Sequence, residues 1–87
     1  MNFYRVTCST KDLDELFSSF ERTKLLDLRK TYIIEEGTNS IIFEIMCRDS
    51  QDYVYNSIRA IMKGILGVFM VTPVYQENSL YYKEHFN

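Results

Sequence analysis

The chain has little of what metal and redox chemistry needs, with two cysteines and one histidine among its 87 residues. Iron–sulfur and soft-metal sites require clustered thiolates, usually in a C-x-x-C spacing. Cys8 and Cys47 lie far apart in the sequence, and His85 stands near the C-terminus. We therefore expect no metal site, no cofactor and no catalytic thiol with a histidine base.

Neither sign of charge dominates the sequence, and it contains no long apolar run. Ten basic and twelve acidic residues give a net charge of −2, so no overall attraction draws the chain to phosphate backbones. The longest apolar stretch, residues 65–74, contains Gly67, Thr72 and Pro73 and is too short to span a bilayer. Residues 1–5 lack the basic and then apolar regions of a secretory signal, so we expect no export signal. We expect no membrane partner and a cytoplasmic location where both cysteines stay reduced.

Alanine is also scarce, with one Ala against eight Ile, seven Tyr and five Asn. Such a bias is expected of AT-rich coding sequence, as in low-GC bacteria and their phages, so we consider a phage-encoded protein. Hydrophobic residues make up 46% of the chain, which is ample for one core, and a domain this small buries roughly 60% of its unfolded surface. We expect an α/β domain over residues 1–75 and an aromatic tail over residues 76–87.

Residue periodicity predicts four strands and two helices before the tail. Residues 23–29 fit either a continued first helix or the start of the second strand. Gly64 or Gly67 is expected to end the second helix in the left-handed conformation. The predicted order is strand 3–8, a helix capped by residues 9–12 and reaching about residue 22, strand 31–36, turn 36–39, strand 40–47, a helix capped by residues 49–52, and strand 68–71 ended by residues 72–73.

A near-repeat supports this order. The segment Tyr4-Arg5-Val6-Thr7-Cys8 matches Phe43-Glu44-Ile45-Met46-Cys47 in apolar pattern, and each runs into a capping cluster and an amphipathic helix. Two such halves predict an α+β fold with a four-stranded antiparallel sheet and two helices on one face. The βαββαβ order resembles the ferredoxin-like αβ-plait, which implies that the first and third strands are central neighbours.

Two consequences follow from that pairing. Arg5 and Glu44 are expected to form a cross-strand ion pair on the uncovered face, where it contributes only about 0.2–1 kcal/mol. Cys8 and Cys47 are expected at opposite ends of the two strands, too far apart for a disulfide.

Part of the chain resembles the RNA-recognition motif. Residues 9–22 are similar to its first helix, and residues 40–61 to its third strand and second helix. That family stacks single-stranded RNA bases on aromatic side chains of the first and third strands. Here Ile42, Glu44 and Met46 occupy the outward positions of the third strand, and Phe3 is the stacking candidate on the first. The resemblance implies a nucleic-acid binder as an alternative function.

Two other plait families are similar in size. Nucleases and integration factors of the Cas2 type resemble the chain in length, and the resemblance implies a homodimer, but their first strand ends in an acidic residue where this chain has Cys8. Acylphosphatases carry an arginine in a glycine-rich loop after the first strand, where this chain has Cys8-Ser9-Thr10. We keep the Cas2-like function as a second alternative.

The uncovered sheet face and the tail are the expected functional regions. Either the tail folds back over its own sheet, or the tail or sheet packs against a second copy or another protein. Because Tyr and Met are well suited to interfaces, we predict a non-enzymatic protein-binding module, homodimeric, that regulates or inhibits a partner protein. The candidate interface residues are Phe3, Arg5, Ile42, Glu44, Met46, Tyr81, Tyr82 and Phe86, and surface positions are also expected for Tyr53, Tyr55 and Met62.

Overall fold

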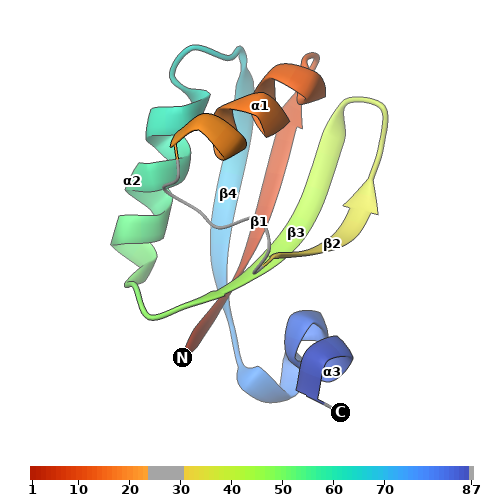
Figure 1. Ribbon diagram of the computed structural model, residues 1–87, viewed down its shortest axis with the longest axis vertical. Coiled ribbons are helices and arrows are strands. Elements are labelled where there is room, and N and C mark those ends of the chain that lie inside the picture. Colours follow the sequence, from red (N-terminus) through yellow and green to blue (C-terminus); the bar gives the residue numbers. More distant parts are fainter. Residues whose placement is uncertain (24–30, 87) are drawn as a thin grey trace.

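The computed structural model describes residues 1–23 and 31–86, which form an α+β protein with a four-stranded antiparallel open sheet and three α-helices (Figure 1). The alternatives for residues 23–29 lie outside the described residues, except that Thr23 ends the first helix. No helix of the described part is long and apolar enough to cross a membrane. The elements are β1 (Asn2–Thr10), α1 (Leu13–Thr23), β2 (Thr31–Glu36), β3 (Ser40–Cys47), α2 (Gln51–Met62), β4 (Gly67–Val74), the short 3-10 helix η2 (Gln76–Asn78) and α3 (Leu80–Phe86).

The strands lie in the order β2-β3-β1-β4. The first strand is central and pairs antiparallel with both β3 and β4, with Arg5 opposite Glu44 on one side and Thr72 on the other. The predicted pairing of residues 3–8 with residues 41–47 is therefore confirmed. Cys8 pairs with Ile41 and Cys47 with Asn2, so the two thiols lie at opposite ends of β1 and β3, as expected.

One face of the sheet packs against α1 and α2. Since side chains alternate along a strand, every second residue of β1 and β3 points toward these helices. Phe20 of α1 meets Phe43 of β3 edge to face, with ring centroids 5.6 Å apart. The predicted sharing of one face by two helical stripes is confirmed by the buried set Tyr4, Val6, Cys8, Leu16, Phe20, Ile41, Phe43, Ile45, Val54 and Ile58.

Side-chain caps set where α1 and α2 begin. The Asp12 carboxylate accepts a 3.0 Å hydrogen bond from the Glu15 amide, and the Ser50 hydroxyl accepts one of 3.2 Å from the Tyr53 amide. Such caps satisfy amides that have no partner inside the helix. The strand before α1 runs two residues beyond the prediction, to Thr10, because the Thr10 amide still donates to the Asn39 carbonyl at 2.8 Å.

The region after α2 corrects two expectations. The second helix ends at Met62 with Lys63 in right-handed conformation, and neither Gly64 nor Gly67 is left-handed. Gly67 is required for a different reason, because a Cβ there would lie 2.3 Å from the Ser9 carbonyl oxygen. Met62, expected at the surface, is buried beside Gly67.

The last strand also continues past its expected end. Pro73 was predicted to stop it near residue 72, yet β4 reaches Val74. Proline lacks an amide hydrogen, and an edge strand tolerates this loss because one of its sides has no neighbouring strand. β4 is such an edge, since among the described strands β1 alone pairs with it.

The tail is folded, which residue periodicity did not predict. The Ser79 hydroxyl caps α3 by accepting from the Tyr82 amide at 3.1 Å, and the Ser79 carbonyl accepts from Lys83 at 3.2 Å. Figure 1 shows α3 at the end of the sheet opposite α1. It packs against β2 and β3, on the sheet face turned away from α1 and α2, which we call the outer face.

Candidate functional site

The eight predicted interface residues occupy one region of the molecule. Five point to the outer face from β1 and β3, and three belong to α3, which lies over Phe3 and Glu44. Of the two covers expected for this face, the structure has the first, in which the tail folds back over its own sheet. The region consists of Phe3, Arg5, Ile42, Glu44 and Met46 in the sheet and Tyr81, Tyr82 and Phe86 in α3.

Glu44 is the polar centre of this region. Its carboxylate accepts hydrogen bonds from Arg5 Nη2 at 2.7 Å and Nε at 3.2 Å, and from the Ser79 hydroxyl at 2.8 Å. The amides of Leu80 and Tyr81 donate to it at 3.3 and 3.4 Å. The Arg5–Glu44 pair forms as predicted, but its expected exposure is wrong: the Glu44 side chain is 0% exposed and that of Arg5 40%, because α3 covers the carboxylate.

Two opposing effects act on the pKa of Glu44. Burial raises the pKa, but the hydrogen bonds from Arg5, Ser79 and the two α3 amides lower it, and their sum places it below the usual range of a glutamate. Negative charge at the first turn of a helix is also favourable, because the helix dipole is positive there. At neutral pH Glu44 is therefore an ionised group that joins β3, β1 and the tail.

Aromatic rings close the region around this carboxylate. Phe3 is 4% exposed and lies against Tyr81 and Tyr82, with ring centroids 6.4 and 5.9 Å away. Tyr82 stacks on Phe86 at 5.0 Å. Phe3, the stacking candidate of the RNA-binding alternative, is thus covered by the protein's own side chains.

The outer face stays open beyond α3, toward the start of β4. Met70 pairs with Thr7 and Val68 with Ser9, so both point to the outer face, and they are 60% and 69% exposed. Leu66, which directly precedes β4, is 95% exposed. Ile42 is half-buried next to Thr7. We call these four apolar residues, Ile42, Leu66, Val68 and Met70, the open patch. Sequence reasoning placed only Ile42 here, although the alternation of residues 66, 68 and 70 was a usable signal.

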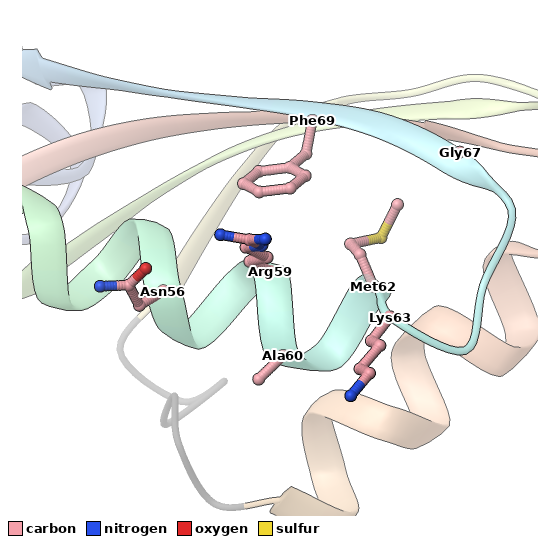
Figure 2. Close-up of a pocket in the computed structure, with 7 residues that line it drawn as sticks. All are labelled: Asn56, Arg59, Ala60, Met62, Lys63, Gly67 and Phe69. Atoms are coloured by element: carbon pink, nitrogen blue, oxygen red, sulfur yellow. The ribbon is translucent and has the colours of Figure 1, made fainter.

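A groove lies between α2 and β4, on the side of the sheet that faces away from the open patch. Figure 2 shows Phe69 of β4 reaching toward Arg59 and Met62 of α2, whereas Lys63 points away. The groove has a volume of about 510 Å³. Next to it the ring of Tyr55 lies 4.9 Å from that of Phe69. An aromatic and a basic side chain of α2 therefore stand beside the free edge of β4.

The two cysteine thiols, the candidate nucleophiles of the chain, lie in surroundings that keep them protonated. Burial raises the pKa of the Cys8 thiol to about 11, and burial is also the main cause of the raised pKa of Cys47. A thiol must be deprotonated to attack or to bind metal, so both are weak nucleophiles at neutral pH. Within residues 1–23 and 31–86, no three His, Cys, Asp or Glu side chains are grouped so as to hold a metal ion.

Comparison of the chain with protein-family models, curated proteins and solved structures finds no match.

Proposed function

We propose that this chain is a non-catalytic protein-binding module that regulates or inhibits a partner protein by covering part of its surface. The observation that carries the proposal is the open patch, whose members Leu66, Val68 and Met70 expose most of their side-chain surface. Large apolar side chains exposed near one another on a small protein are typical of an interaction site. Its position on a sheet face favours a broad, flat contact.

A ferredoxin-like plait is part of the same proposal. The βαββαβ order of residues 2–74, with both helices on one face and β1 beside β3, supports it. In this interpretation α3 is an addition that covers part of the face which a bare plait would leave open. The part that stays open is the partner surface.

The polar groups support binding over catalysis. Glu44 is saturated by hydrogen bonds from Arg5 and the start of α3, and Asp12 and Ser50 act as helix caps. Cys8 is buried with a raised pKa. Each of these groups has a structural role that would be lost if it took part in a reaction.

A capture experiment with paired variants tests the open patch. The tagged wild-type protein and a Val68→Lys/Met70→Lys variant are incubated with native lysate, and bound proteins are identified by mass spectrometry. Both residues are exposed, so the variant is expected to fold, but desolvating two lysines should abolish binding to an apolar partner surface. Tyr53→Lys on α2 is the matched control, because Tyr53 is also exposed and lies outside the patch.

The expected result is a protein that wild type and Tyr53→Lys capture and the double variant does not. Equal capture by all three would overturn the proposal. So would binding of labelled single-stranded RNA that survives about 200 mM salt and is lost in Phe3→Ala, because that outcome would support the RNA-binding alternative.

A further inference from the structure

The groove between α2 and β4 combines apolar side chains with charge of one sign. Phe69 is half-buried and Met62 is buried, and both line the groove next to Gly67, which has no side chain. Figure 2 shows Arg59 and Met62 on the side of α2 that faces Phe69. Arg59 and Lys63 are the charged residues of the lining, and none of the described acidic residues belongs to it.

Neither of these cations is neutralised by the described part of the chain. Both are exposed, and neither forms a hydrogen bond or ion pair with residues 1–23 or 31–86. Asp52, the acidic residue of α2, precedes Arg59 by about two turns, or about 10 Å along the helix axis. The Arg59 guanidinium therefore keeps all its N–H donors available at the groove.

The backbone of β4 does not provide a place for an added strand beside this groove. The Val71 carbonyl already accepts from Gln51 Nε2 at 3.1 Å, and Pro73 has no amide hydrogen to donate. An occupant must therefore be held by side chains, and the groove offers a guanidinium next to an aromatic ring.

We propose that this groove binds an acidic segment of a partner protein that also carries an apolar side chain. A carboxylate of the segment accepts the two parallel N–H bonds that the planar Arg59 guanidinium can donate, and Lys63 adds attraction at the rim. The apolar side chain lies against Phe69 and Met62, since a thioether adapts to varied apolar shapes.

Charge and shape favour this occupant over others. The groove is open along α2 (Figure 2), whereas sites for small molecules enclose most of their ligand. Two cations on a chain of net charge −2 are too few to follow a phosphate backbone, but they attract a short acidic segment. The groove and the open patch lie on opposite faces of the sheet, so this inference does not depend on the function proposed above.

A display library of random peptides is the probe for this groove. The wild-type protein should enrich peptides in which Asp or Glu stands near an apolar residue, and fluorescence anisotropy of a labelled, enriched peptide gives the dissociation constant. Arg59→Glu should raise this constant about tenfold or more. Arg59→Lys should raise it less, because lysine keeps the charge but loses the fork.

The matched control is Lys83→Glu on α3, which makes the same change of charge at an exposed position and should leave the constant unchanged. Urea unfolding of each variant verifies that it folds as wild type does. The absence of any enriched peptide, an enriched set without acidic residues, or equal affinity of Arg59→Glu and Lys83→Glu would overturn the proposal. So would single-stranded RNA binding or a dimer mass that Arg59→Glu abolishes, because either would show a different occupant.

The variant Val68→Lys/Met70→Lys separates the groove from the open patch. It should bind the enriched peptide as wild type does, even if it captures no partner from lysate. A peptide that this variant loses and Arg59→Glu keeps would belong to the open patch, and that result would overturn the groove while leaving the proposed function standing.

Discussion

The Glu44 side chain connects segments that are far apart in the sequence. Arg5 in β1, Ser79 in the tail and two amides of α3 all donate to one carboxylate. Hydrogen bonds to an ionised acceptor are roughly twice as strong as neutral ones. Because the carboxylate is buried, loss of its charge or of its donors is costly.

Glu44→Gln should therefore destabilise the protein by about 1–3 kcal/mol. The amide keeps the size of the side chain, but its NH2 group would face donors such as the Ser79 hydroxyl and the Tyr81 amide. Urea unfolding gives the free energy. Glu36→Gln, at an exposed position on β2, is the control and should change it by less than about 0.5 kcal/mol; equal losses in both variants would contradict the role of Glu44.

The lowered pKa of Glu44 sets the sign of a pH effect. The unfolded chain has the ordinary glutamate value, about 4.3, so above it the carboxylate contributes its full stability. That contribution is lost as the pH falls through the folded-state pKa. The difference in unfolding free energy between wild type and Glu44→Gln should thus be constant near neutral pH and shrink in acid. A difference that grew below pH 4 would reverse this assignment.

At the scale of whole elements, the bounds of β2 and β3 could be predicted to the residue. The first is rich in β-branched and aromatic residues, the second alternates, and turn or capping residues follow both. The first strand and β4 were predicted too short. Their ends depend on partners elsewhere: Thr10 is held by Asn39, and Pro73 is tolerated only because β4 is an edge. Local sequence carries neither fact.

The close approach of β1 and β4 gives a matched pair of glycine variants. Gly67→Ala would place a methyl group 2.3 Å from the Ser9 carbonyl oxygen and 3.0 Å from Met62 Cε, so the backbone must shift at a cost of about 1–3 kcal/mol. Gly64→Ala meets nothing within 4 Å and should be neutral within about 0.5 kcal/mol. Thermal unfolding of both variants measures the difference; a Gly67→Ala protein as stable as Gly64→Ala would contradict the contact.

The candidate site could be predicted only in part, because, like the ends of β1 and β4, some of it depends on partners that are distant in the sequence. The outward residues of β1 and β3 follow from alternation, and so does the Arg5–Glu44 pair. Burial of Glu44 depends on α3, a helix of seven residues that is too short to show a clear period. Its position rests on Ser79 and Glu44, which are 35 residues apart, so no local pattern indicates that they meet.

Taken together, the described elements form one core in which Cys8 lies at the centre, beneath α1 and α2. Cys8 is 0% exposed and its thiol has a pKa of about 11, whereas Cys47 is half-buried at the sheet end. A thiol-reactive probe should label Cys47 first and Cys8 only when the protein unfolds globally. Labelling each thiol in a Cys→Ser variant of the other separates the two rates; Cys8 labelling that is insensitive to urea would contradict this view.

The central position of β1 has a consequence for how the chain acquires its fold. Asn2 pairs with Cys47 and Phe3 with Val74, so the strand made first waits for neighbours made much later. Contacts of such high contact order slow folding, since long loops must close before any pairing is gained. On the ribosome, the apolar N-terminal segment would emerge long before its second neighbour and stay available to chaperones until synthesis passes residue 74.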